Sequence, residues 1–164
     1  MSDLIPKPPM PKSFIGLHHL KLPCHSIKKT HEFYTTIFPL KPMPHADHFT
    51  PDHQLFAKLC IHEATKLIVE LRYEPTQANL QKGWDPITYA VGTRKDLERW
   101  GEWFDANGVK HSRIFTGVSA WVMACEDPDG KIVRLYVSEE EHEWTDHVDR
   151  DEHWLGNVKA DPNT

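Results

Sequence analysis

The chain has 164 residues, a formal net charge of −5 with histidine counted as neutral, and three cysteines. This length fits a single domain, and an acidic balance without a basic stripe argues against nucleic acid as a partner. No run reaches the ~18 apolar residues that a membrane-spanning helix needs. The first residues also lack the basic segment and apolar core of a secretory signal. We therefore expect a cytoplasmic protein with no nucleic-acid or membrane partner.

The cysteines are Cys24, Cys60 and Cys125, an odd number without the spacing of a metal site. We expect them to be buried or idle thiols in a reducing compartment. Four prolines within residues 1–13 predict an extended arm, so the folded domain should begin near Phe14.

Hydrophobic periodicity predicts the elements of the first half of the chain. Alternating residues favour strands, and Ser26 stands where a helix N-cap belongs, ahead of apolar residues at helical spacing. The predicted elements are a strand at 16–23, a helix at 27–38, a loop or irregular strand at 43–53, and strands at 54–62 and 65–73.

A polar linker over 74–84 then separates the first half from a second set of similar elements. Gly108 stands where a C-cap glycine belongs, and the four residues 127–130, DPDG, are a strong turn signal. The predicted elements are a strand at 86–92, a helix at 95–107, and strands at 109–115, 118–126 and 131–137.

The two halves repeat each other in sequence. Residues 68–71 read IVEL and residues 132–135 read IVRL, at matching places near the end of each half. When the two halves are superposed on this repeat, His19 is expected to lie opposite Thr88. The order is therefore βαβββ, linker, βαβββ, with modules at about 14–73 and 86–137, which predicts an α+β domain with an internal repeat.

The remaining segment, 138–164, begins with a run of glutamates and is expected to be a solvated acidic tail. Trp144 and Trp154 interrupt its polarity. They suggest that part of the tail packs on the domain or on a second subunit.

Three short motifs resemble the vicinal oxygen chelate superfamily, which includes glyoxalase I, extradiol dioxygenases and bleomycin-binding proteins. They are GLHHLKL at 16–22, FY at 33–34 and DPDG at 127–130. The resemblance covers residues 14–137. It implies a glyoxalase-like fold, in which the two βαβββ modules form a curved mixed sheet around a central cleft.

Metal-dependent members of that superfamily take a His from the first strand of each module and a Glu from the last. His19 and Glu70 match this pattern, whereas Thr88 and Arg134 stand at the other two positions. Arginine is a fixed cation without a lone pair to offer. We therefore expect no metal and no other cofactor; if a metal is bound, His19 and Glu70 should hold it.

The resemblance further implies a polar cleft. The catalytic candidates are His19 as proton carrier, Glu70 as a carboxylate and Arg134 as the fixed charge for a substrate oxyanion. Alternatives stay open: a structural Glu70–Arg134 ion pair, and a His19 that only satisfies its own surroundings. The residues expected to contact substrate are Lys21, Arg72, Thr88 and Tyr136, with a solvated rim as the other interpretation of Lys21.

Three functions follow from this cleft. The first is a metal-independent enzyme that acts on an oxygenated small molecule by proton transfer, of the isomerase, dehydratase or cyclase type. The second is a protein that binds and sequesters a small molecule without catalysis. The third is a conventional metal-dependent lyase or dioxygenase. A homodimer is left open. The histidine groups outside the cleft are not expected to bind metal; they are His45, His48 and His53, and His142, His147 and His153.

Overall fold

The computed structural model describes Met10 and residues 16–117, 119–138, 152–155 and 161–163. Most of the predicted arm, together with Trp144, His142 and His147, lies outside these residues. In the described part of the chain no helix is long and apolar enough to cross a membrane.

The first module follows the predicted order, with two short strands and a 3-10 helix in place of the irregular loop. Its elements are β1 (Leu20–Cys24), α1 (Ile27–Thr36), β2 (Lys41–Pro42), η1 (Pro44–Ala46), β3 (His48–Phe49), β4 (Leu55–His62) and β5 (Leu67–Tyr73). The sheet order is β1-β5-β4-β2, with β3 also paired to β4, and β1 runs parallel to β5. The predicted linker contains a short helix, α2 (Pro75–Leu80), which begins with a proline, as helices often do.

The second module repeats this arrangement. Its elements are β6 (Ile87–Val91), α3 (Arg94–Ala106), β7 (Phe115–Thr116), β8 (Trp121–Glu126) and β9 (Ile132–Val137), followed by α4 (Glu152–Leu155). The sheet order is β6-β9-β8-β7, and β6 runs parallel to β9. The strand predicted at 109–115 is reduced to an isolated bridge between His111 and Cys125 and the start of β7, and at Ser112 the side-chain hydroxyl rather than the backbone carbonyl accepts the Ala124 N–H.

Side-chain caps begin both long helices, at Ser26 as the sequence predicted and at Thr93, for which no cap was predicted. The Ser26 hydroxyl accepts the backbone N–H of Lys29 at the start of α1. Thr93 and Asp96 form a capping box at the start of α3, in which each side chain accepts the other residue's backbone N–H. Gly108 follows α3 with a φ of 65°, a left-handed conformation that favours glycine.

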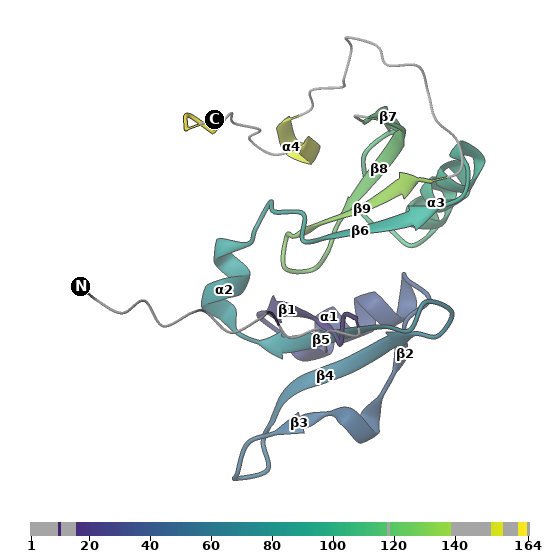
Figure 1. Ribbon diagram of the computed structural model, residues 1–164. Helices are drawn as coiled ribbons and strands as arrows, with labels where there is room; N and C mark the ends of the chain where they lie inside the picture. The colour runs from purple at the N-terminus through teal and green to yellow at the C-terminus, as the bar shows by residue number, and fades with distance from the viewer. Residues whose placement is uncertain (1–9, 11–15, 118, 139–151, 156–160, 164) are drawn as a thin grey trace.

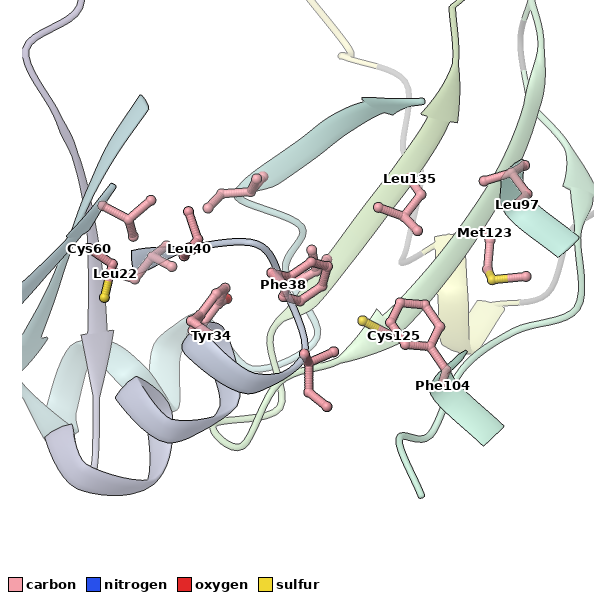
Figure 2. Close-up of a cluster of buried hydrophobic side chains, with 14 of the residues drawn as sticks. Leu22, Tyr34, Phe38, Leu40, Cys60, Leu97, Phe104, Met123, Cys125 and Leu135 are labelled. Atoms are coloured by element: carbon pink, nitrogen blue, oxygen red, sulfur yellow. The ribbon is translucent and has the colours of Figure 1, made fainter. Parts of the chain in front are cut away.

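One hydrophobic core joins the two modules on the helix side of both sheets (Figure 2). Phe38, just after α1, lies at its centre, with ring centroids 5.6 Å from Trp100 and 6.2 Å from Phe104 of α3. Leu22 and Leu71 contribute from the first sheet. From the second sheet come Val133, Leu135 and Met123. The three cysteines are free and buried, as predicted.

A buried charge cluster fastens the turn before β9 to the first module. The Lys131 ammonium is fully buried, 3.2 Å from Asp127 and 3.4 Å from Asp129, and it donates to the Pro23 carbonyl at 2.9 Å. Tyr34 of α1 donates its hydroxyl to Asp127 at 3.1 Å. The DPDG motif is therefore more than the predicted turn: its carboxylates hold the two modules together.

The pKa values of these two carboxyls shift in opposite directions. Burial raises the pKa of Asp127, which the Lys131 ammonium only partly opposes. Burial also opposes the ionised form of Asp129, but hydrogen bonds from His25 and Thr30 outweigh it and lower the pKa of that carboxyl. The junction thus depends on one buried cation shared between two carboxylates.

Candidate functional site

Six of the seven expected site residues lie on strands, on the sheet face opposite the helices, whereas His19 directly precedes β1, which begins at Leu20 rather than at residue 16 as predicted. In the first sheet Lys21 pairs with Glu70, and in the second Thr88 pairs with Arg134. Thr88 is therefore the structural equivalent of Lys21, and the expectation that His19 lies opposite Thr88 is wrong. Leu71 and Leu135, the sequence neighbours of Glu70 and Arg134, point into the core, and successive side chains of a strand alternate between faces. Figure 1 shows β1 and β6 as the edges at which the two sheets face each other. We refer to the two faces opposite the helices as the two halves of the open surface.

Glu70 is the centre of the first half. Its side chain is 1% exposed, and its carboxylate lies 3.1 Å from the His19 Nε2 and 2.7 Å from the Arg72 Nε. The Lys21 ammonium lies 4.0 Å away. The His19 contact has the distance of an ion pair but not the angle of a hydrogen bond, so Glu70 Oε2 has no hydrogen-bond donor within the described residues. The structure thus brings four of the seven predicted site residues together.

A fifth residue of this half, His48, was not predicted to take part. Its Nδ1 lies 3.9 Å from Glu70 Oε1, and its ring packs against Phe56 with centroids 5.6 Å apart. The Arg72 guanidinium lies over the same Phe56 ring, 5.4 Å from its centroid. His48 reaches the site because β3 pairs with β4 through an irregular register, which alternation in the sequence does not reveal.

Arg134 occupies the second half with different partners. Its Nε lies 2.9 Å from Asp85, and one of its terminal nitrogens donates to the Trp154 carbonyl at 3.2 Å. The prediction that Glu70 and Arg134 contact each other is therefore wrong. Asp85 is closer because the Ile132 N–H donates to the Trp84 carbonyl, which holds the residues before β6 against the start of β9.

Thr88 and Tyr136 line a cavity of about 360 Å³ in the second half. The Tyr136 hydroxyl accepts the Ser119 N–H at 3.0 Å and lies 3.0 Å from the Ser119 hydroxyl, which fixes its position. Thr88 and Tyr136 thus lie on the expected face. Among the described residues, neither forms a hydrogen bond or ion pair with Glu70 or its partners.

Trp154 covers the apolar part of the second half. Its side chain is 8% exposed and packs on a cluster formed by Phe115, Val122, Ala124 and Ile132. For this tryptophan the expectation that part of the tail packs on the domain is confirmed.

The donor set of the open surface does not fit a divalent metal. His19 and Glu70 are adjacent, as two ligands would be, but the Arg72 guanidinium already contacts Glu70. In the second half Arg134, a fixed cation, stands at the position equivalent to Glu70, and its register partner is Thr88, a poor ligand. The described residues contain no group of three or more His, Cys, Asp or Glu side chains that could hold a metal ion.

Comparison with solved structures identifies the fold. The chain is similar to FosX, a fosfomycin resistance protein from Listeria monocytogenes, at 16% identity and a TM-score of 0.61, over 76% of this chain and 94% of that one. It is similar to a glyoxylase/bleomycin resistance protein/dioxygenase domain from Frankia sp. at 18% identity and a TM-score of 0.61, over 77% and 99% of the two chains. TnmS3, an antibiotic binding protein from Streptomyces sp., matches at 13% identity and a TM-score of 0.61, over 76% and 97%.

No protein-family model matches the chain, and no curated protein matches it either. The structural likeness nevertheless shows that the chain has the vicinal-oxygen-chelate fold, an α+β arrangement of two βαβββ modules, as the sequence motifs predicted. At these sequence identities the likeness shows the fold alone, and proteins of one fold can differ in their chemistry.

Proposed function

We propose that the protein is a metal-independent enzyme that transfers a proton on an oxygenated small molecule bound to the open surface. The observation that carries this proposal is the buried Glu70 carboxylate beside the His19 ring. A buried carboxylate next to a partly exposed imidazole is an arrangement suited to general acid–base catalysis.

In this proposal His19 is the proton carrier. Its Nε2 faces Glu70, and its Nδ1 lies 2.7 Å from the Nδ1 of the exposed His18. The Nδ1 side is thus the one that a substrate can reach by displacing His18. A proton taken up there would give an imidazolium stabilised by Glu70, whose own position is held by Arg72. The proton would come from a carbon or hydroxyl next to a substrate carbonyl.

Arg134 is proposed to stabilise the oxyanion that develops on that carbonyl. A guanidinium supplies a fixed charge and directed donors, the role that a metal plays in other proteins of this fold. Asp85 would orient the guanidinium through its contact with Nε. Lys21, Thr88 and Tyr136 would bind the rest of the substrate, from both halves of the surface.

A second candidate function is binding without catalysis. It is favoured by the apolar cluster beneath Trp154, because ligand-binding sites are lined mainly by apolar side chains with a few polar groups. The similar TnmS3 is an antibiotic binding protein, which shows that the fold can serve this purpose.

The test begins with a thermal-shift screen of hydroxy acids, keto acids and their esters, followed by turnover assays with a chelator present. His19→Ala should lower turnover about 10²–10⁴-fold and Arg134→Gln about 10²–10³-fold, while the exposed His45→Ala serves as the matched control. If both site variants turn over at the wild-type rate, the mechanism is wrong. Ligands that bind tightly and are never converted would establish the binding function instead.

Metal independence is tested separately by elemental analysis of the protein after removal of any affinity tag. We expect no stoichiometric divalent ion. One bound ion per chain that disappears in His19→Ala would overturn this part of the proposal.

A further inference from the structure

Trp154 occupies the second half of the open surface in the way a ligand would. Its indole lies on apolar residues contributed by three different strands: Phe115 from β7, Val122 and Ala124 from β8, and Ile132 from β9. In Figure 1 the short helix α4 that carries it lies beside β8, well separated from α3. The surface beneath the indole is therefore shaped to accept a flat aromatic group.

Two cations flank this aromatic position. Arg134 donates to the Trp154 carbonyl oxygen at 3.2 Å, and the Lys110 ammonium lies 5.7 Å from the centroid of the indole. Lys110 is itself held by Glu126 at 3.0 Å. The site thus offers an apolar floor for a ring, a cation beside the ring face, and a guanidinium for an oxygen acceptor next to the ring.

From this geometry we propose that the second half of the surface is a binding site for an aromatic molecule that carries a carboxylate or carbonyl group, and that Trp154 is its intramolecular competitor. The ring of the ligand would take the place of the indole, and its oxygen would take the place of the Trp154 carbonyl at Arg134. The inference deepens the proposed function by naming a substrate class, and it rests on that function only for the role of Arg134.

An aromatic carboxylate can displace the tail because it offers Arg134 a stronger acceptor than a backbone carbonyl does. A carboxylate carries a charge opposite to that of the guanidinium and can accept two parallel hydrogen bonds from it, whereas the Trp154 carbonyl is neutral and accepts one from Arg134. The tail has the advantage of being tethered, which gives it a high effective concentration. A ligand therefore binds the wild-type chain with an apparent affinity reduced by the fraction of molecules whose tail is docked.

The competing explanation is that Trp154 only covers apolar surface. In that case its removal would lower stability and leave a sticky patch without chemical preference. A binding site, in contrast, would prefer an aromatic carboxylate over both an aromatic amine of the same size and an aliphatic carboxylate, and the preference would depend on Arg134.

The experiment compares full-length wild type and Trp154→Ala by calorimetry with three probes: 2-naphthoate, 2-naphthylmethylamine and cyclohexanecarboxylate. If the tail is docked about nine-tenths of the time, Trp154→Ala should bind 2-naphthoate about tenfold more tightly than wild type. Adding Arg134→Gln should abolish this gain. Trp103→Ala, which removes a half-exposed tryptophan from α3, is the matched control and should leave binding unchanged.

Equal affinity of wild type and folded Trp154→Ala for 2-naphthoate would overturn the proposal, as would equal gains for all three probes. Should Trp154→Ala not fold, wild type labelled with 5-fluorotryptophan gives the same answer by fluorine NMR. The Trp154 signal, assigned with Trp154→Phe, should shift toward that of exposed indole as 2-naphthoate is added, and an unmoved signal at saturation would contradict the proposal. Because these readouts need no turnover, they can succeed even if the proposed catalysis fails.

Discussion

The two halves of the open surface occupy equivalent places in the repeat but have opposite character. In the first half the register pair is Lys21 and Glu70, and a buried carboxylate lies under a group of cations and imidazoles. In the second half the pair is Thr88 and Arg134, and a guanidinium lies at the edge of an apolar cluster. One change of charge at the central position thus accompanies the difference between a polar half and an apolar half.

The two halves also differ in the residues that neutralise their central charges. Each central charge is neutralised within its own half, Glu70 mainly by Arg72 and Arg134 by Asp85, rather than across the surface. Under the proposed function, a ligand would bridge the two halves. An aromatic acid on the second half would extend its reactive carbon or hydroxyl toward His19 on the first.

The strongest test of this comparison is to make the halves alike. Thr88→His combined with Arg134→Glu would place a His and a Glu on the central register pair of the second half, to act with His19 and Glu70 of the first. We expect this double variant to bind one Zn²⁺ or Mn²⁺ per chain with a dissociation constant of about 1 μM, which corresponds to a binding free energy of about −8 kcal/mol. Isothermal titration calorimetry with tag-free protein provides the measurement.

Wild type and Thr88→His alone are the controls, and both should bind at least about 100-fold more weakly because Arg134 still opposes the ion. If the double variant binds metal no better than wild type, the two halves are not placed around a common centre, and the bridging role proposed for the ligand loses its basis.

The next largest effect is expected at the junction that fixes the halves relative to each other. Lys131→Met preserves most of the side-chain volume but leaves Asp127 and Asp129 buried without their cation. Removing one partner of a buried ion pair costs about 3–5 kcal/mol in the free energy of unfolding. Urea denaturation at neutral pH would measure this loss. Lys110→Met, at a half-exposed ion pair, should cost about 1 kcal/mol or less.

The pH dependence distinguishes lost charge pairing from lost packing. Burial already raises the pKa of Asp127, and removing Lys131 should raise it further. A carboxyl whose folded-state pKa is raised favours folding below its unfolded pKa of about 4, and this contribution is lost as pH rises through the folded-state value. The destabilisation of Lys131→Met should therefore shrink as pH falls toward 4. A loss independent of pH would show that packing is the cause.

The repeat in the sequence predicted most of the fold. The IVEL and IVRL segments predicted two equivalent strands, and the structure places Glu70 and Arg134 in the same register position of each sheet. The cleft face followed from strand alternation once this register was known. Of the motifs that supported the resemblance, DPDG forms the turn before β9, and the end of GLHHLKL, residues 20–22, forms the start of β1.

The partners of those central residues could not be predicted in the same way. Asp85 reaches Arg134 through a backbone contact before β6, and His48 reaches Glu70 through an irregular strand register. Trp154 is separated from its strands by a long tail. These contacts depend on local irregularity and long-range packing, for which periodicity gives no signal.

The smallest expected effect compares the two central charges directly. Glu70→Gln keeps the shape of the side chain but removes the charge from contacts with His19 and Arg72, and hydrogen bonds to charged groups contribute about 1.5–3 kcal/mol. Arg134→Gln breaks an ion pair with Asp85 in which both side chains are at least one-fifth exposed, 21% and 26%, so we expect about 1 kcal/mol or less. Urea denaturation of both variants measures the difference. Equal losses would mean that the two halves protect their central charges equally well, and that the polar half owes its buried carboxylate to packing rather than to its cations.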